Sequence, residues 1–351
     1  MSDVRSFRIA GLSASDAATR LRWDRYVRAH SGASFFHLAG WQDVIQDCFG
    51  HDTYFLYAES DSGEIVGVLP LAHVSSRLFG SSLTSLPFAS YGGVIADDEE
   101  IATALENEAS GLARQLGVDW FESRNLLRRH PQWPAQELYV TFKRAIPAEL
   151  DERMRSIPQK RRNMVRKAIK LGLRPVVDDT VENFYPVFSE NARNHGTPVL
   201  PRRFFFKLKE VFGRDCEIQS IHDQRGRCVS SILCFYFKDE VLAYYAGESL
   251  AARNTAANDL KYWSLMCRAA ERGCKVFDLG RSKKGTGSFE FKRLWDFQPQ
   301  QLHYEYDLIR RNTIPQNNPM NKKYRLLIAT WKRLPLPVAE LIGPFVVKNL
   351  G

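Results

Sequence analysis

The chain has 351 residues, of which 44% are hydrophobic and 25% charged, and its formal net charge is +9. This composition is typical of a folded globular protein of about two domains and excludes a disordered or fibrous chain. No stretch approaches the roughly 18 uncharged apolar residues of a transmembrane helix, and the first residues lack a signal-peptide core, so we expect a cytoplasmic protein without a transmembrane segment.

The first half of the chain follows an α/β order. Helical patterns at 15–30 and 38–49 precede a hairpin around the turn 61–63, and a helix at 98–116 leads into a short strand at 118–123. Helical periodicity and Gly-containing turns predict these elements.

Residues 153–175 carry nine Lys/Arg and no acid, which equals the whole net charge of the chain. We predict a helix over 157–171, with Pro158 in its first turn and Gly172 at its end. An acid-free basic face favours an anionic partner such as phosphate, nucleic acid or a lipid headgroup, although a merely solvated helix is the alternative. Helical periodicity places the arginines and lysines on the solvated face, opposite an apolar stripe. The candidate anion-binding residues of this helix are Arg161, Arg162 and Arg166.

The second half repeats the order of the first. Its predicted elements are helices at 181–194 and 202–212, strands at 216–223, 227–237 and 241–249, a helix at 258–272 and a strand at 274–280. Three matches relate the halves, at separations of 163, 155 and 156 residues: Gly63 with Gly226, Tyr91-Gly92 with Ala246-Gly247, and 116–122 with 272–278. The nearly constant separation indicates a duplicated unit, with chance similarity between α/β modules as the alternative.

This order predicts mixed sheets with helices on both faces, an α/β (α+β) architecture. We expect one domain at 1–150, a second at 151–310 and a helical tail at 311–351. In the tail, a polar linker at 312–323 precedes short helices at 324–333 and 338–349. Their mixture of apolar and basic residues suits docking on the core, or peripheral contact with the inner face of a membrane.

The six cysteines form no C-x-x-C pair and no Cys/His cluster with zinc spacing. Most lie in apolar runs, where cysteine behaves as a small buried hydrophobe. We therefore expect free and mostly buried thiols, without a disulfide scaffold or a metal site.

Two segments of the second half carry a family resemblance: FDLGRSKKGTGSFEFKRLW from Phe277 and HGTPVLPRRFF from His195. With the tandem units and the basic helix between them, they resemble the FemAB-like branch of the GNAT N-acyltransferase superfamily, above all its members associated with exopolysaccharide and PEP-CTERM/exosortase systems. The resemblance covers about residues 10–307. It implies two tandem GNAT-like (acyl-CoA N-acyltransferase-like) domains and transfer of an acyl or aminoacyl group to an amine of an envelope or polysaccharide precursor. In the peptidoglycan branch the donor is an aminoacyl-tRNA.

The predicted strand at 274–280 is followed by a basic, glycine-containing segment, 281–287. Ligands favour strand ends in α/β sheets, and glycines let backbone N–H groups approach phosphate. Arg281, Ser282 and Lys283 are therefore candidate phosphate ligands, although the Walker A spacing is absent and a flexible basic turn is the alternative.

Three residues are candidates for the chemistry of transfer. Phe291-Lys292 is similar to the Phe-Lys pair of the peptidoglycan branch, and an ammonium beside a carbonyl would stabilise the developing oxyanion; an exposed helix lysine is the alternative. The family often places glycine after the aromatic residue that follows, whereas here Asp296 follows Trp295. Asp278 and His195 could accept the amine proton, with a salt bridge and simple helix termination as their structural alternatives.

The GNAT pyrophosphate signature, Q/R-x-x-G-x-G/A, has an altered counterpart at Arg253–Asn258, which keeps the arginine but lacks both glycines. The N-terminus of the predicted helix would still face an anion bound there, so Arg253 and Asn258 are further candidates for phosphate binding. The first half has four acids at 97–100, which would repel phosphate. We therefore expect the second domain to be active and the first to be degenerate.

The sequence thus predicts an acyltransferase or aminoacyltransferase with no tightly bound cofactor, whose co-substrate is aminoacyl-tRNA or acyl-CoA. Its acceptor would be a phosphate-bearing envelope or exopolysaccharide intermediate. The alternatives are an acyl-CoA-dependent GNAT enzyme on a small molecule, and a non-catalytic protein that binds RNA or anionic lipid.

Overall fold

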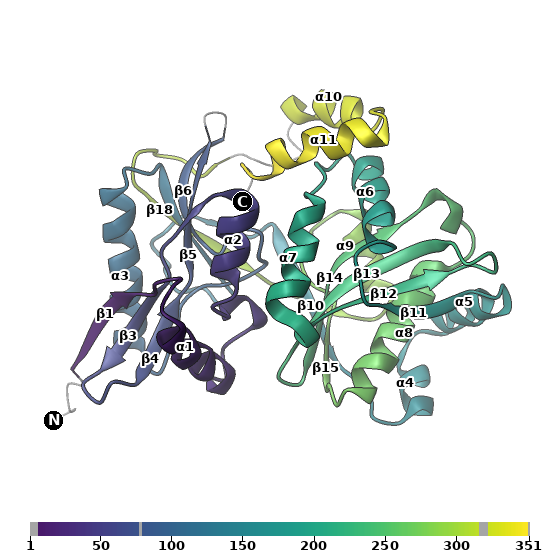
Figure 1. Ribbon diagram of the computed structural model, residues 1–351, viewed down its shortest axis with the longest axis horizontal. Helices are drawn as coiled ribbons and strands as arrows, with labels where there is room; N and C mark the ends of the chain where they lie inside the picture. The colour runs from purple at the N-terminus through teal and green to yellow at the C-terminus, as the bar shows by residue number, and fades with distance from the viewer. Residues whose placement is uncertain (1–5, 77–78, 316–321, 350–351) are drawn as a thin grey trace. The chain divides into compact units, whose positions relative to one another are not determined.

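The computed structural model describes residues 6–76, 79–315 and 322–349, and it divides into two compact units (Figure 1). Unit 1 contains residues 1–137, 301–317 and 348–351, and unit 2 contains residues 138–300 and 318–347. Both units are therefore discontinuous in the sequence. They differ from the predicted segments 1–150 and 151–310 in two strands. The strand at 139–145 belongs to unit 2, and the strand at 303–308 belongs to unit 1.

Unit 2 is built on a mixed sheet with the strand order β11-β12-β13-β14-β15-β10-β16, and β17 pairs with β10. The strands are Tyr139–Ala145 (β10), Arg174–Asp178 (β11), Cys216–His222 (β12), Cys228–Phe237 (β13), Glu240–Glu248 (β14), Val276–Asp278 (β15), Ser282–Lys283 (β16) and Gln298–Gln301 (β17). Neighbours along the order are antiparallel except β14 and β15, which are parallel. A parallel pair needs a crossover connection, and the helix Ala257–Glu271 (α8) supplies it.

Helices cover both faces of this sheet, in agreement with the nearly continuous burial of β13. The helices of unit 2 are Leu150–Ser156 (α4), Gln159–Lys170 (α5), Phe184–His195 (α6), Arg202–Phe212 (α7), Ala257–Glu271 (α8), Gly287–Arg293 (α9), Lys322–Trp331 (α10) and Leu336–Val347 (α11), with 3-10 turns at Gly213–Asp215 (η2) and Leu250–Ala252 (η3). Ile232 and Cys234 share a core cluster with Leu265 of α8 and Val165 of α5. On the opposite face, α6 and α7 contribute Phe188 and Phe204, which contact Tyr245 of β14 edge to face.

Unit 1 contains two sheets, ordered β1-β3-β4-β7 and β2-β5-β6-β8-β18-β9. Its strands are Phe7–Gly11 (β1), Asp52–Thr53 (β2), Leu56–Ser60 (β3), Ile65–Leu69 (β4), Leu71–Ser76 (β5), Gly80–Ser85 (β6), Ile95–Ala96 (β7), Trp120–Asn125 (β8), Ala135–Gln136 (β9) and His303–Leu308 (β18). Its helices are Ala17–Ala29 (α1), Trp41–Phe49 (α2) and Glu99–Gln115 (α3), with a 3-10 turn at Phe35–His37 (η1). Pro70, which has no N–H to donate, separates β4 from β5.

The two units share one strand order when β4 and β5 are taken as one interrupted strand. The order β1-β3-β4/β5-β6-β8-β18 of unit 1 corresponds to β11-β12-β13-β14-β15-β10 of unit 2. Along this path the parallel pair is β6 with β8 in unit 1 and β14 with β15 in unit 2. In each unit the crossover helix, α3 or α8, lies between the two strands of that pair in the sequence. The last strand of each order, β18 or β10, comes from a distant part of the chain. This common order supports the duplication inferred from sequence.

Capping residues explain the ends of the two crossover helices. The Asp98 side chain accepts a hydrogen bond from the backbone N–H of Ile101, and Gly117, with a φ of +63°, follows the end of α3. Both are ordinary helix signals. Helix α8 differs, because its N-cap residue is Ala256, which has no side-chain acceptor. The first N–H groups of α8 therefore receive no side-chain cap.

The predicted helices are confirmed, with shifts of a few residues at their ends. One helix was not predicted. The basic segment contains α5 and also the end of a preceding helix, α4, and Ile157 and Pro158 separate the two. Of the predicted linker 312–323, residues 316–321 lie outside the described part of the chain. All six cysteines are free thiols, four of them buried.

Candidate functional site

The parallel strands of unit 2 separate shortly after they begin to pair. β14 and β15 are in register only over Glu240–Leu242 and Val276–Asp278, whereas β14 continues to Glu248. The pairing of β14 with β13 is also irregular beside Tyr244. At Gly280, where φ is +69°, the chain turns away, and a Cβ there would lie 2.9 Å from the carbonyl oxygen of Ala243. The outer half of β14 thus lacks its parallel neighbour, at the end of the sheet where α/β proteins bind ligands.

Lys292 of α9 reaches into this region and is 5% exposed. Its Nζ donates hydrogen bonds to the carbonyl oxygens of Gly280, at 2.7 Å, and Arg281, at 3.1 Å, and it lies 5.6 Å from the ring centre of Phe142. Burial lowers the pKa of Lys292 to about 7, with Arg281 acting in the same direction and Asp278 opposing. The alternative of an exposed helix lysine is wrong, because the side chain is enclosed by the strand ends.

Asp278 is fully buried beneath the same turn. Its Oδ1 accepts hydrogen bonds at 2.7 Å from the Thr141 hydroxyl and from the backbone N–H of Gly280, and Lys143 lies 3.5 Å from its other oxygen. Lys143 also pairs with Glu240 at 2.7 Å. Burial and the nearby Asp278 raise the pKa of Glu240, against the effect of Lys143. Asp278 is therefore placed to hold the turn, without exposure to solvent.

The predicted phosphate ligands after β15 lie beside Lys292. The Arg281 guanidinium is 4.8 Å from the ring centre of Tyr139 and acts electrostatically on Tyr245, whose pKa burial raises. Ser282 is buried and shares a 3.0 Å hydrogen bond with the hydroxyl of Ser288. Lys283 is partly exposed, and burial lowers its pKa. The structure thus places Arg281 in contact with Lys292 through its carbonyl oxygen, and Ser282 in contact with α9 through Ser288.

The start of α8 forms a second polar region of unit 2. Arg253 is exposed, and Asn258 accepts a 2.6 Å hydrogen bond from the Nζ of Lys261, a lysine whose pKa burial lowers to about 8. Ser249 is buried, and its hydroxyl has no hydrogen-bond partner among the described residues. Asn254 and Ala256 have φ of +66° and +61°. The segment therefore keeps left-handed turns that glycine would adopt readily.

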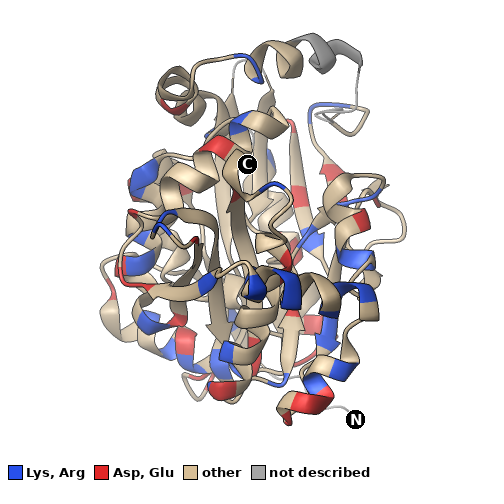
Figure 2. Ribbon diagram, turned by 90° about the vertical axis from the view of Figure 1, so that its right-hand side faces the viewer, with Lys and Arg blue, Asp and Glu red and all other residues tan. Residues whose placement is uncertain are grey.

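The three arginines predicted on the basic helix have different environments. Arg161 is buried, and its Nη1 bonds Asp259 of α8 at 3.0 Å, so its place on the solvated face is wrong. Arg162 donates to the carbonyl oxygens of Arg155 and Ile157. Arg166 is exposed, as are Lys160, Lys167 and Lys170. Lys and Arg are frequent on this side of unit 2 (Figure 2). The exposed part of the helix thus remains a cationic surface.

His195 is the last residue of α6 and is exposed, so it belongs to the helix and precedes the turn at Gly196. Within the described part of the chain, no hydrogen bond or ion pair joins it to Lys292 or Asp278. His195 thus makes no direct polar contact with Lys292 or Asp278 in the described part of the chain, and its role stays a prediction.

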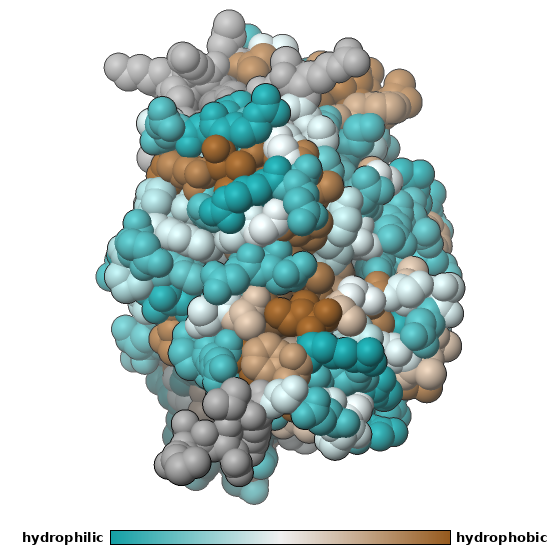
Figure 3. All heavy atoms as spheres, turned by 90° about the vertical axis from the view of Figure 1, so that its left-hand side faces the viewer, coloured by the Kyte–Doolittle hydropathy of each residue, from teal (hydrophilic) through white to brown (hydrophobic). Residues whose placement is uncertain are grey.

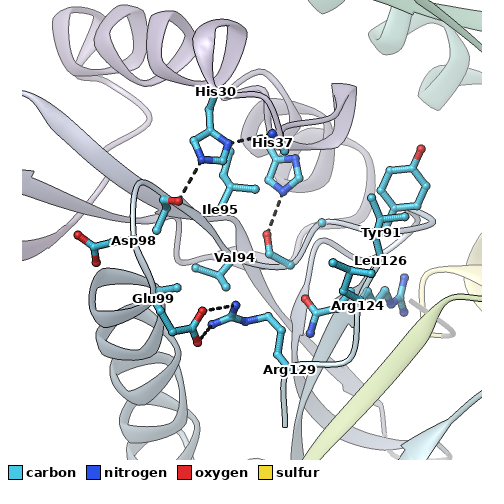
Figure 4. Close-up of a pocket in the computed structure, with 17 residues that line it drawn as sticks. His30, His37, Tyr91, Val94, Ile95, Asp98, Glu99, Arg124, Leu126 and Arg129 are labelled. Atoms are coloured by element: carbon cyan, nitrogen blue, oxygen red, sulfur yellow. Dashed lines mark hydrogen bonds and ion pairs between the residues drawn. The ribbon is translucent and has the colours of Figure 1, made fainter. Parts of the chain in front are cut away.

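Unit 1 contains a pocket of about 450 Å³ at the start of α3 (Figure 4). The polar side chains that line it include His30, His37, Glu99, Arg124, Asn125 and Arg129. No prediction from sequence located this pocket. The paired glycines Gly92-Gly93 were the sequence feature that could have indicated it. The structure shows why glycine is needed there, since a Cβ at Gly93 would lie 1.8 Å from the Oδ1 of Asn125.

The polar groups of this pocket are engaged by the protein itself. His30 and His37 accept backbone N–H groups at Nδ1, and their Nε2 atoms lie 3.0 and 2.9 Å from the carbonyl oxygens of Ala96 and Gly93. Arg129 pairs with two glutamates (Figure 4 shows the bidentate pair with Glu99). These contacts shape the walls of the pocket. They agree with the expectation that unit 1 carries no donor site, which stays a prediction.

Sequence reasoning also missed Thr141, Lys143 and Glu240, which surround Asp278. Thr141 and Lys143 lie on β10, 137 and 135 residues before Asp278 in the chain. The run YVTFKRA has a strand-like composition. Its partner strand, however, could not be identified without the sheet order.

Comparisons with known proteins agree with this geometry. A family model described as an acetyltransferase (GNAT) domain matches residues 155–293. No curated protein sequence matches the chain.

Three solved structures illustrate the likeness of fold. FemX has a TM-score of 0.64 at 14% identity, over 85% of this chain and 97% of its own. A tandem GNAT protein from the clavulanic acid biosynthesis pathway has a TM-score of 0.55 at 12% identity, over 86% and 98%. The C-terminal domain of a putative lysylphosphatidylglycerol synthetase from Agrobacterium fabrum has a TM-score of 0.56 at 15% identity, over 81% and 91%. The chain therefore has the fold of two tandem GNAT-like domains, and residues 155–293 match a GNAT acetyltransferase domain.

Proposed function

We propose that the protein is an N-acyltransferase or aminoacyltransferase of the FemAB-like type and that unit 2 holds the reaction site. The observation that carries the proposal is the burial of the Lys292 side chain at the point where β14 and β15 separate, and in its protonated form this lysine is the oxyanion donor of the proposal. Two carbonyl oxygens hold it, and a lysine has a third N–H to offer. In a water-poor site, such a donor stabilises a developing oxyanion strongly.

The start of α8 is the proposed site for the phosphate groups of the donor. Its first N–H groups have no side-chain cap, the Ser249 hydroxyl is without a partner among the described residues, and Arg253 is exposed nearby in sequence. A helix N-terminus favours anions. The signature has glycine at the positions of Ala256 and Asn258, and Ala256 keeps a left-handed conformation that glycine would adopt readily, which supports phosphate binding in spite of the loss of the glycines.

The reaction would be acyl transfer to an amine. The amine nitrogen attacks the donor carbonyl carbon to form the new C–N bond, and the Lys292 ammonium stabilises the negative oxygen of the tetrahedral intermediate. The intermediate then collapses with cleavage of the bond to the carrier, which leaves as the thiolate of CoA or, with the proton given up by the amine, as a ribose hydroxyl of tRNA. Asp278 is a positioning residue in this scheme, because it is buried and holds Gly280. The proton of the attacking amine leaves by a route for which His195 stays a candidate.

The acceptor class follows from the family likeness and from the cationic surface of α5. We propose an amine of an envelope or exopolysaccharide precursor that carries phosphate, held in part by Arg166 and the exposed lysines of α5. Acyl-CoA transfer to a small molecule is the alternative within the same fold.

A donor panel tests the proposal. The full chain is incubated with acetyl-CoA, longer acyl-CoA thioesters or charged tRNA, with amino sugars as acceptors, and products are identified by mass spectrometry. Lys292→Met should bind the preferred donor within about twofold of wild type and lose at least 100-fold in turnover, in the range of one oxyanion donor. Exposed Lys275→Met, outside the basic segment 281–287, is the matched control. Strong, salt-sensitive RNA binding without turnover of any donor would support the non-catalytic alternative instead.

A further inference from the structure

Helix α11 is apolar around its whole circumference, although it lies at the surface. Its twelve residues, LPVAELIGPFVV, include a single charge, Glu340. A surface helix ordinarily has a polar outer face, and a helix that is apolar on all sides is typical of a protein core or a membrane environment. Helix α11 therefore has an apolar inner face, toward unit 2, and an apolar outer face, and each needs an explanation.

The inner face of α11 packs closely on unit 2. Ala339 and Gly343 are buried, and a Cβ at Gly343 would lie 2.6 Å from the carbonyl oxygen of Val199. The carboxylate of Glu340 accepts a 2.6 Å hydrogen bond from the hydroxyl of Ser189 on α6. The small residues and the single acid are thus used to attach the helix to the protein.

The outer face of α11 is a continuous apolar row. Val338, Leu341, Ile342 and Phe345 are all exposed, with Leu341 at 70% and Phe345 at 66%, and they follow the i, i+3, i+4, i+7 spacing of one helix face. Leu327 on α10 is 64% exposed. The face drawn in Figure 3 is mainly hydrophilic with small separate apolar patches. Four large apolar side chains in one helical row therefore indicate an interaction surface.

Basic residues border this row. Residues 322–349 contain six Lys/Arg and one acid, Glu340. Lys332 and Arg333, between the two helices, and Lys348, directly after α11, are exposed. An apolar face with basic residues at its ends is the pattern of a helix that lies in the interface of an anionic bilayer.

We propose that the outer face of α11 docks on an anionic lipid bilayer, with Leu341, Ile342 and Phe345 at the acyl boundary and Lys332 and Arg333 at the headgroups. At 12 residues, α11 is about 18 Å long and lies in the plane of the interface. No helix in the described part of the chain is long and apolar enough to cross a membrane. A second copy of the chain fits less well, because a two-fold contact would face the same basic residues toward each other.

Vesicle co-sedimentation of the full chain tests this proposal. Wild type should bind phosphatidylcholine vesicles that contain phosphatidylglycerol, and should bind pure phosphatidylcholine vesicles at least tenfold more weakly. The Leu341→Glu/Phe345→Glu variant should lose at least tenfold in affinity for the anionic vesicles, and Lys332→Glu/Arg333→Glu should lose binding together with its salt dependence. Leu127→Glu is the control, since Leu127 is a 78% exposed leucine of unit 1.

Folding and self-association are checked in parallel. Each variant should keep the wild-type melting temperature within a few degrees, and Leu341→Asn alone serves if the double glutamate variant does not fold. Absence of wild-type binding, or equal binding by the α11 variants and the control, would overturn the proposal. A concentration-dependent dimer in light scattering that the α11 substitutions abolish would also overturn it, in favour of a second copy.

Discussion

Lys292 and Asp278 bind the two ends of the same residue. The Lys292 ammonium donates to the carbonyl oxygen of Gly280 at 2.7 Å, and the backbone N–H of Gly280 donates to the Asp278 carboxylate, also at 2.7 Å. Gly280 is thereby fixed in a left-handed turn directly after β15. The two predicted residues thus cooperate in placing the strand end, whichever of them touches substrate.

The stability of the protein should depend on pH through Lys292. Its pKa is about 7 in the fold and about 10.4 in an unfolded chain, so between these values the unfolded chain binds more protons. Stability then rises with pH over this window, by at most about 1.4 kcal/mol per pH unit for this group, and the contribution is constant below pH 7. In urea unfolding from pH 6.5 to 9.5, wild type should gain stability relative to Lys292→Met as pH rises.

Lys261 contributes a smaller effect of the same sign, because burial lowers its pKa to about 8. Since Lys261 is present in both proteins, its effect cancels in the comparison with Lys292→Met. Substitution of the exposed Lys170 by Met is the control and should give a profile parallel to wild type. Parallel profiles for Lys292→Met and wild type would contradict the lowered pKa.

Arg161 and Arg166, five residues apart in the basic segment, should respond differently to substitution. Arg161→Ala leaves Asp259 buried without its partner, which should cost about 3 kcal/mol of unfolding free energy. Arg166→Ala removes an exposed charge and should change stability by less than about 0.5 kcal/mol. Chemical denaturation measures both values.

In binding, Arg166 should matter more than Arg161, the reverse of their order in stability. If α5 holds phosphate, Arg166→Ala should weaken binding of a polyanion such as heparin and reduce its dependence on salt, whereas folded Arg161→Lys should bind as wild type. Equal losses for both variants would mean that Arg161 is available to ligands in solution, contrary to its burial.

The sequence predicted those elements whose signals are local. Helix α7 begins and ends at its predicted residues, 202 and 212, because its apolar periodicity and the following Gly213 lie within a few residues of one another. Strands β10 and β18 were missed because each pairs with a distant strand; Lys143 lies opposite Asp278, and Tyr306 opposite Glu122. Local sequence patterns carry no information on which distant strand a given strand will pair with.

The candidate site shows the same division. The resemblance pointed to Lys292, but its burial depends on Gly280 and Phe142, which only the tertiary structure brings to it. Arg161 was placed on the solvated face because helical periodicity describes one helix alone. Its partner, Asp259, lies 98 residues later on α8.

The group around Asp278 should be strongly coupled. Asp278→Asn removes a buried charge from the side of Lys143, and it should cost about 2–4 kcal/mol because Glu240 alone then balances that lysine. Thr141→Val removes one hydrogen bond to the carboxylate and should cost about 1.5–3 kcal/mol. In the double variant the two losses should fall short of their sum by more than about 0.5 kcal/mol. Additive losses in urea denaturation would show that the hydroxyl does not bind the carboxylate in solution.

Ala256 is a non-glycine residue in a left-handed conformation, directly before α8. Such a conformation costs an L-residue with a Cβ about 1–2 kcal/mol. Ala256→Gly removes that cost but adds backbone entropy to the unfolded chain, by up to about 1 kcal/mol, so the net effect should lie between neutral and about 1 kcal/mol stabilising. Ala270→Gly, within the same helix, is the control and should destabilise by about 1 kcal/mol. If Ala256→Gly destabilised as much as Ala270→Gly, the turn before α8 would not be left-handed, and the proposed phosphate site would lose the backbone that supports it.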